Sequence, residues 1–539
     1  MFKNKPTLVL IPVFVLLIIC VIQQPLFSQK TKIYDLVKDF KAVPDNKTDN
    51  YLAFVKAAET ISKAGGGQLN IPMGNYYIAA YKTAEKNKLY NAGDIIFRNC
   101  NNLTIIGNNA VIRVNGNFIR KSDYQIPAVP FNYSYSNTVC PFKLMNCKNV
   151  LLKDITLYGE VDKMRKEAVV EGESYGVYIA DDEPAQVSSK IVLQNITAHH
   201  FAADGFLIKS NGQDILLNKC NSYKNARQGL SIVKGKNIKV FNSSFDSTGL
   251  TGGGYGWHAP GAGIDVENEF GAGKLTNVLI RNCNMRGNNG FQIVTTLQSE
   301  NVTIDSCFIS DPLGGYSEIL QGVGVYSLSS TISNSIIFGN VQVDLAGQIY
   351  QGPLMQEINR NIIYSGTRGI VSSDFFRPVN ITDNIIIMLP KPKMDDYFPY
   401  IQNPNCTYNR NVLVVHADRL KKEPNSVTAL VQYAKEANED FWLVNGYDTP
   451  LDKRKTVYFM PATNDTKIVK DHFFGPSNLI SGYDFHKTNF LTNTQVNTIL
   501  NRELFTAYKQ TSFNRKYLLQ ANDVRKYTGN LVSVAKKNK

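Results

Sequence analysis

The chain has 539 residues, of which 43% are hydrophobic and 19% charged, so it can bury a large core and is not a disordered segment. Lys and Arg outnumber Asp and Glu by 58 to 45, which gives a formal net charge of +13 and favours a polyanionic partner. The basic residues are dispersed and form no basic helix or aromatic RNA-binding signature, which argues against nucleic acid and favours an acidic polysaccharide.

Residues 1–28 have the composition of a signal peptide. Two lysines precede an apolar run from Leu8 to Ile22, and polar and small residues follow it. The run has fifteen residues and contains a proline, whereas a membrane-spanning helix needs about 20. Cleavage removes two lysines and no acid, so the charge falls from +13 to +11. We therefore expect a secreted, periplasmic or cell-surface protein that is monomeric and has no membrane contact after cleavage.

A strand motif recurs along the chain at intervals of about 24 residues. Examples are "KIVLQNITAHH", "DILLNKCNSYK" and "NVLIRNCNMRG". The aligned positions are Ile155, Ile196, Cys220, Ser243, Cys283, Cys307, Ser335, Asn361 and Asn384. A unit of two or three short strands cannot bury its apolar face alone, but stacked units share one core. The pattern predicts an all-β fold, a right-handed parallel β-helix over residues 29–415, with the aligned cysteines as small core residues in one buried column.

A second strand of each unit starts at a glycine, as in "DGFLIKS", "QGLSIVK" and "AGIDVEN". These glycines are Gly176, Gly205, Gly229, Gly263, Gly290, Gly322 and Gly369, and we expect them at a bend, where the lack of a Cβ permits the turn. Because side chains alternate along a strand, Asp265 and Glu267 should point away from the core. The same register exposes pairs of residues on neighbouring coils: Leu207 and Lys209, Ser231 and Val233, and Gln292 and Val294.

Two units carry insertions at the same place, residues 159–175 and 249–262. They are three coils apart, so at about 4.8 Å per coil they stand roughly 14 Å from each other and could wall a cleft. The cleft would be floored by Lys209, Arg227 and Ser231 and walled by Asp265 and Glu267. The second insertion brings Tyr255, Trp257 and His258 to the same place.

The segment before the repeat resembles the start of the pectate-lyase-like β-helix superfamily, which includes polygalacturonase-related proteins. The matching features are Asp39-Phe40, Thr48-Asp49, a helix near Leu52 to Lys63, the run Gly65-Gly66-Gly67 and Pro72-Met73-Gly74-Asn75-Tyr76. Lys41 stands where the family usually has Gly. The resemblance, with the repeats, covers residues 33 to 415 and implies an N-terminal capping helix on the β-helix.

The stretches "RQGLSI" and "APGAGIDVEN" resemble an Arg-x-Gly and a Gly-Ile-Asp-hydrophobic-Glu pattern of uncharacterised members of this superfamily. The resemblance implies that Arg227, Asp265 and Glu267 are functional. The polygalacturonase motifs Asn-Thr-Asp, Asp-Asp, Gly-His-Gly and Arg-Ile-Lys are absent in that order, which argues against a polygalacturonase proper.

Three functions fit these residues. A glycoside hydrolase needs two carboxyls about 5 to 9 Å apart, and Asp265 and Glu267 meet that spacing. A polysaccharide lyase or epimerase would use Ca²⁺ on the same two acids, with Lys209 or Arg227 as base or carboxylate clamp. A glycan-binding β-helix without catalysis is the third. We assign Trp257, Tyr255, Ser231 and Gln292 to substrate contacts, with Trp257 as the stacking platform, and His258 to catalysis or to a turn cap.

The repeat fades after residue 415. The segments "SVTALVQYAKEAN" and "NTQVNTILNRELFTAYKQ" have helical spacing, and no Gly/Ser linker precedes them. Residues 416–539 are therefore expected to form a mixed C-terminal cap or a small accessory region.

Overall fold

The structure is a computed structural model. It describes residues 32–79, 94–115, 140–163, 174–182, 186–249, 260–268, 275–296, 298–310, 321–343, 354–365, 368–372, 377–388, 400–401 and 403–416, together with short strands between residues 427 and 490. Within these residues, no helix is long and apolar enough to cross a membrane.

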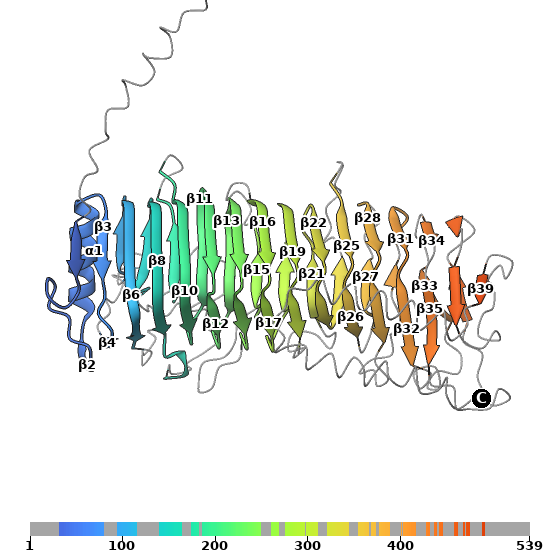
Figure 1. The fold of residues 1–539 in the computed structure, drawn as a ribbon, viewed down its shortest axis with the longest axis horizontal. Helices are drawn as coiled ribbons and strands as arrows, with labels where there is room; N and C mark the ends of the chain where they lie inside the picture. Colours follow the sequence, from blue (N-terminus) through green and yellow to red (C-terminus); the bar gives the residue numbers. More distant parts are fainter. Residues whose placement is uncertain are drawn as a thin grey trace, which may run out of the picture.

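Nearly all described elements are short parallel strands, and their pairing sorts them into three sheets that run along the molecule (Figure 1). Sheet A contains β1 (Ile33–Asp35), β3 (Gly67–Asn70), β16 (Leu275–Arg281), β19 (Ser299–Asp305), β22 (Ser330–Ser333), β25 (Gln356–Asn359), β28 (Val379–Thr382), β31 (Cys406–Asn409), β34 (Glu436–Asn438) and β37 (Lys467–Ile468). Sheet B contains β2 (Asp45–Asp49), β4 (Asn75–Ile78), β12 (Asn221–Tyr223), β14 (Ser244–Asp246), β17 (Asn284–Arg286), β20 (Phe308–Ser310), β23 (Ile336–Phe338), β26 (Ile362–Ser365), β29 (Ile385–Met388), β32 (Val412–His416), β35 (Phe441–Asn445), β38 (Asp471–Phe474) and β39 (Thr488–Phe490). Sheet C contains β5 (Ile96–Arg98), β7 (Phe142–Met145), β9 (Val177–Ala180), β15 (Ile264–Val266), β18 (Ile293–Thr295), β21 (Gln321–Val325), β24 (Asn340–Val343), β27 (Ile370–Ser372) and β30 (Tyr400–Ile401).

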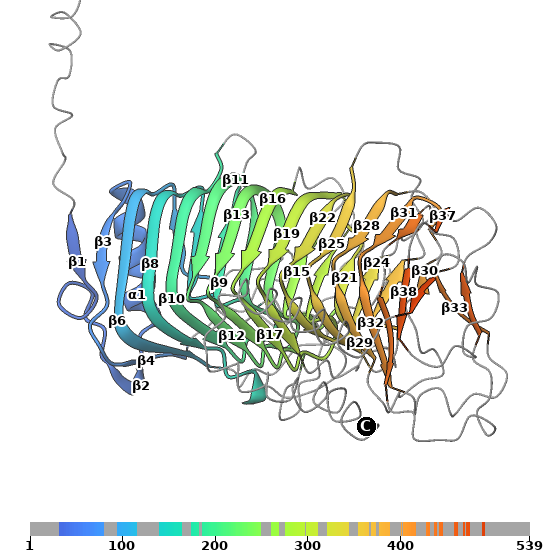
Figure 2. The same ribbon diagram turned by 45° about the vertical axis from the view of Figure 1, so that its right-hand side comes forward.

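Five long strands bend from one sheet into the next. β6 (Asn101–Val114), β8 (Lys148–Tyr158) and β10 (Ser189–His199) belong to sheets A and B, and β11 (Asp204–Asn218) and β13 (Gln228–Phe241) belong to sheets C and A. Figure 2 shows these strands curving around the molecule. Because every coil passes through the sheets in the same order and pairs in parallel with the next, the fold is a right-handed parallel β-helix, as predicted.

The expected N-terminal cap is helix α1 (Tyr51–Lys63). Its apolar face, which includes Phe54 and Ile61, is buried against the first coils. The ring of Phe54 makes edge contacts with Tyr76 and Phe142, with centroids 6.0 and 6.5 Å apart. The helix therefore covers the apolar end of the core that the first coil would otherwise expose (Figure 1).

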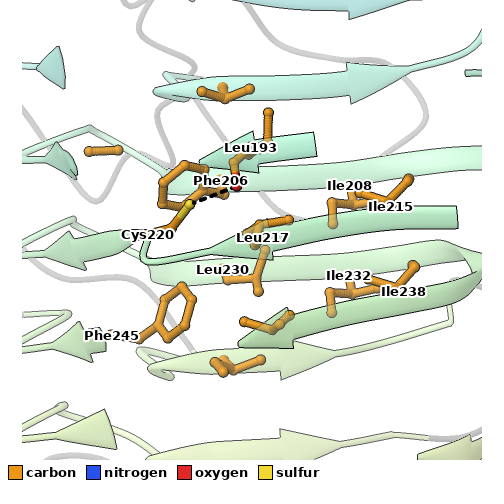
Figure 3. Packing of buried hydrophobic residues seen from close by; sticks show 14 of the residues in the cluster. Leu193, Phe206, Ile208, Ile215, Leu217, Cys220, Leu230, Ile232, Ile238 and Phe245 are labelled. Atoms are coloured by element: carbon orange, nitrogen blue, oxygen red, sulfur yellow. Dashed lines mark hydrogen bonds between the residues drawn. The ribbon is translucent and has the colours of Figure 1, made fainter. Parts of the chain in front are cut away.

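The predicted inward column is confirmed. The strand register places Ile155, Ile196 and Cys220 on successive coils, and Cys283 and Cys307 continue the column, all of them buried. All seven cysteines in the described part of the chain are free, buried thiols. In Figure 3, Cys220 lies among Leu193, Phe206 and Leu217, and its thiol contacts the carbonyl oxygen of Leu193 at 3.5 Å. These cysteines therefore act as small core residues.

The seven recurring glycines lie where sheet C begins, but a bend is not what requires them. Of the seven, only Gly369 has a left-handed φ, +74°. A Cβ on Gly229 would lie 2.5 Å from the carbonyl oxygen of Gly263, and a Cβ on Gly176 would lie 2.6 Å from that of Gly205. The glycines are needed because neighbouring coils approach too closely for a side chain at this corner.

The helical spacing after residue 415 does not correspond to helices where the structure describes the chain. Residues 426–438 contain the strands β33 (Val427–Val431) and β34, and β33 pairs with β36 (Tyr458–Pro461). β34 pairs in parallel with β31, and β32, β35, β38 and β39 continue sheet B. The last coil offers unpaired backbone groups, and the following segment satisfies them as strands despite its helical spacing. The segment at residues 493–510 lies outside the described residues.

Candidate functional site

Sheet C carries the residues that the sequence singled out. Leu207 of β11, Ser231 of β13 and Asp265 of β15 are direct neighbours in register. Ile264 and Val266, on either side of Asp265, belong to the core. Because side chains alternate along a strand, Asp265 points to the outer side of sheet C, as predicted. The coils thus place Asp265 one step from Ser231 and two steps from Leu207.

A hydrogen-bonded network surrounds Asp265. The guanidinium of Arg227 donates two hydrogen bonds to Asp204, from Nε to Oδ1 at 2.9 Å and from Nη2 to Oδ2 at 2.7 Å. Ser231 Oγ lies 2.8 Å from Oδ2 of Asp204 and also contacts Oε1 of Gln228. Nε2 of Gln228 lies 2.5 Å from Oδ2 of Asp265. A continuous polar chain therefore joins Arg227 to Asp265 across three coils.

Asp265 is a buried acid. Its side chain is 2% exposed, and Oδ1 is buried without a hydrogen-bond partner among the residues that the structure describes. Burial raises the pKa of Asp265 well above its ordinary value, and the nearby Glu267 and Asp204 raise it further against the opposing effects of Arg227 and Gln228. The carboxyl therefore retains its proton under conditions in which an ordinary aspartate has lost it.

Glu267 follows the end of β15 and is exposed. Its backbone N–H donates to the carbonyl oxygen of Ile232 at 2.9 Å, which keeps it beside β13. The two carboxyls thus lie two residues apart in contrasting environments, one buried and proton-holding and the other in contact with solvent. Such a contrast allows one acid to donate a proton while the other acts as a carboxylate.

The outer side of sheet C is not the open surface that we expected. Leu207, Val233, Ser231 and Val294 are buried there. Gln292 is fully buried, and its amide is engaged by the turn at Asn288: Oε1 accepts from the backbone N–H and the side-chain amide of Asn288, and Nε2 donates to the Asn288 carbonyl. Alternation correctly predicts the side on which a residue lies, but burial depends on what else covers that side.

Of the remaining sequence candidates, one lies on β11 and three lie outside the described residues. Lys209 is half-buried on β11. Tyr255, Trp257 and His258 lie outside the described residues, as do most of the two insertions expected to wall a cleft.

Asp204 and Gln228 are two site residues that the sequence reasoning missed. Each immediately precedes a recurring glycine, Gly205 or Gly229, and the two residues pair in register. The residue before the recurring glycine lies at the start of sheet C on each coil. An acid or amide at this position could therefore have been predicted to lie near Asp265. The Arg227 guanidinium forms an ion pair with Asp204 of the neighbouring coil.

The acids of sheet C do not form a calcium cage. Among the described residues, no group of three or more His, Cys, Asp or Glu side chains is placed to hold a metal ion. Asp204 is paired with Arg227 and Asp265 faces the Gln228 amide, whereas Ca²⁺ requires six to eight oxygen ligands. The donor set therefore does not fit the calcium alternative.

A second buried polar pair lies at the other end of the same outer row. Lys143 of β7 and Asp94 are both buried, with Nζ 3.1 Å from Oδ2. Nζ of Lys143 also lies 4.7 Å from the ring centroid of Tyr178. Burial raises the pKa of Asp94 to about 6, although Lys143 lowers it. The row from Lys143 through Tyr178 and Leu207 to Ser231 and Asp265 is thus polar at both ends and apolar between them.

His199 and His200 lie side by side at the end of β10. The ring of His199 is stacked between Tyr158 and Tyr223, with centroids 4.8 and 4.7 Å away. The Nδ1 atoms of the two histidines are 2.6 Å apart, so one ring must accept a hydrogen from the other. Burial, with a smaller effect of His200, lowers the pKa of His199 to about 4 from its ordinary 6.5.

This lowered pKa predicts acid sensitivity. The unfolded chain binds a proton at His199 near pH 6.5 and the folded chain only near pH 4, so stability is lost as pH falls between these values. The difference between these two pKa values corresponds to about 3 kcal/mol before solvent screening, which makes the actual loss smaller. His199→Phe keeps the stack without the titration, and we expect its urea midpoint to fall less between pH 7 and pH 4.5. Tyr223→Phe is the control and should keep the wild-type pH dependence. Equal slopes in wild type and His199→Phe would contradict the prediction.

These features define a right-handed parallel β-helix protein with a buried acid network on one sheet. The chain matches no protein family model and no curated protein sequence. It is similar in structure to the A-module of mannuronan C-5 epimerase AlgE4 from Azotobacter vinelandii, with 12% identity over 86% of this chain and 100% of that chain and a TM-score of 0.42. It is also similar to the Streptococcus pneumoniae surface protein and adhesin PfbA, with 12% identity, 86% and 100% coverage and a TM-score of 0.41. A tailspike protein of E. coli bacteriophage HK620 gives 11% identity, 86% and 78% coverage and a TM-score of 0.43.

Proposed function

We propose that the protein is an exported glycoside hydrolase that cleaves an anionic polysaccharide with Asp265 and Glu267. The observation that carries the proposal is the contrast between these acids: Asp265 is buried with a raised pKa, and Glu267, two residues on, is exposed. Glycoside hydrolysis uses two carboxyls in contrasting environments, one that donates a proton and one that acts as a carboxylate.

In the proposed reaction Asp265 donates its proton to the glycosidic oxygen as the bond from that oxygen to the anomeric carbon breaks. The Glu267 carboxylate either attacks the anomeric carbon or takes a proton from the water that does so. Alternate Cα atoms of a strand are about 6.6 to 6.8 Å apart, which allows the carboxyl spacing of either stereochemical course. Because Asp265 is buried, the proposal requires its carboxyl to become accessible when substrate binds.

An anionic glycan is the proposed substrate because the protein is basic and the charge of Arg227 acts on Asp265. The net charge is +13, or +11 without the expected signal peptide. The Arg227 side chain is held by Asp204 and 20% exposed, and Lys209 is half-buried on the neighbouring strand. Fixed cations beside a cleavage site attract a polyanion and orient its carboxylates or sulfates.

The test is incubation with a panel of neutral and anionic polysaccharides, measuring new reducing ends and the ultraviolet absorbance of unsaturated sugar ends. Reducing ends without absorbance support hydrolysis. New absorbance would show a lyase instead, and altered sugars without cleavage would show an epimerase. Binding without any chemical change would show a glycan-binding solenoid. The Asp265→Asn/Glu267→Gln double variant is the matched control for contaminating activity.

A further inference from the structure

The network around Asp265 contains fewer hydrogens than its contacts need if the amide of Gln228 has a single fixed orientation. With Nε2 toward Asp265, Oε1 of Gln228 faces the Ser231 hydroxyl, which also faces Oδ2 of Asp204. Both of these partners are acceptors, and a hydroxyl has one hydrogen. One of the two contacts would then join two oxygens without a hydrogen between them.

Reversing the amide supplies the missing hydrogen, provided that Asp265 is protonated. Asp265 then donates to Oε1 of Gln228, Nε2 donates to Ser231 Oγ, and Ser231 donates to the Asp204 carboxylate, which Arg227 holds. Each contact now has one donor and one acceptor. The two ends of a glutamine amide have nearly the same shape, so both orientations fit the same space.

We infer that Gln228 is a positioning residue for Asp265. The Gln228 amide accepts a hydrogen bond from Asp265 when that carboxyl is protonated, and it reverses to donate a hydrogen bond when Asp265 is a carboxylate. The reversal moves the Ser231 hydrogen from Asp204 to Gln228, so the protonation of Asp265 is linked to Asp204 on a coil two steps away. Gln228 is 3% exposed and Ser231 4%, which shields this exchange from water. The catalytic meaning of the inference rests on the proposed function, but the linkage itself does not.

The linkage predicts shifts of opposite sign. In the ionised state Gln228 donates to a charged oxygen, which is the stronger of its two hydrogen bonds, so Gln228→Met should raise the pKa of Asp265. In the protonated state Ser231 donates to the charged Asp204 and in the ionised state only to a neutral amide, so Ser231→Ala should lower that pKa. A hydrogen bond contributes roughly 0.5 to 1.5 kcal/mol, so each shift should be about one pKa unit.

The experiment is an infrared titration of the full chain labelled with ¹³C-aspartate, with Asp265→Asn identifying the Asp265 band. Three other charged groups affect the pKa of Asp265, namely Asp204, Arg227 and Glu267. Both variants retain all three. Ser244→Ala is the matched control, because Ser244 Oγ lies 2.5 Å from Oδ2 of another partly buried acid, Asp246, on sheet B. It should leave the Asp265 band unchanged.

Opposite shifts in the two variants support the inference, whereas shifts of the same sign, or none in either folded variant, overturn it. The titration needs no substrate, so its outcome is separate from the proposed function. Opposite shifts in a protein that cleaves no glycan would leave the linkage intact and remove the hydrolase. Glycan cleavage that depends on Asp265, without opposite shifts in the two variants, would support the hydrolase and remove the linkage.

Discussion

Asp265→Asn should lower kcat on the cleaved polysaccharide by about 10² to 10⁴, the usual contribution of a general acid. The substitution keeps the shape of the side chain and removes the proton that the leaving oxygen needs. Glu267→Gln should cause a loss of the same order because the second carboxyl is also required. Both variants should fold normally, since neither removes volume from the core.

The pH profile provides a second readout of the same prediction. An acid must be protonated to donate, so activity should persist as pH rises until Asp265 ionises, which its raised pKa places well above the range of an ordinary aspartate. Asp246→Asn is the matched control, because Asp246 also has a pKa raised by burial and a buried Oδ1 without a hydrogen-bond partner, but lies on sheet B. Full activity of both Asp265→Asn and Glu267→Gln would refute the site.

Lys143→Met should lower the free energy of unfolding by about 3 to 5 kcal/mol at pH 8, the usual cost of removing one partner of a buried ion pair. The substitution leaves the Asp94 carboxylate buried without its lysine. The pKa of Asp94 is already raised to about 6, and without Lys143 it should rise further. The folded chain then holds a proton that the unfolded chain releases near pH 4, so stability falls as pH rises above that value.

The loss should therefore be smaller at pH 5, where Asp94 is neutral in the folded variant. Urea unfolding at the two pH values measures this difference. Asp94→Asn combined with Lys143→Met removes the uncompensated charge and should recover part of the loss. Lys239→Met, at an exposed lysine on sheet A, is the matched control and should have little effect. An equal loss at pH 5 and pH 8 would show that the ion pair is not its cause.

The strand motif was sufficient to predict the β-helix because its physical basis is local. Alternation along a strand sets which side each residue faces, and the interval of about 24 residues sets which residues stack. The confirmed column through Ile196, Cys220 and Cys283 follows from these two facts. Beyond residue 415, short apolar segments matched helical spacing equally well, and strand pairing with the preceding coil decided between the two.

The sequence by itself determined that Asp265 lies on the outer side of its sheet and that a carboxylate follows two residues later. The tertiary structure decided that Asp265 is buried with a raised pKa, and that its neighbours are Gln228 and Asp204. These partners come from other coils, and Gln228 is 37 residues away in the chain. Alternation is a property of one strand, whereas burial and hydrogen bonding at Asp265 depend on several coils stacked together, because desolvation is set by everything that surrounds the carboxyl.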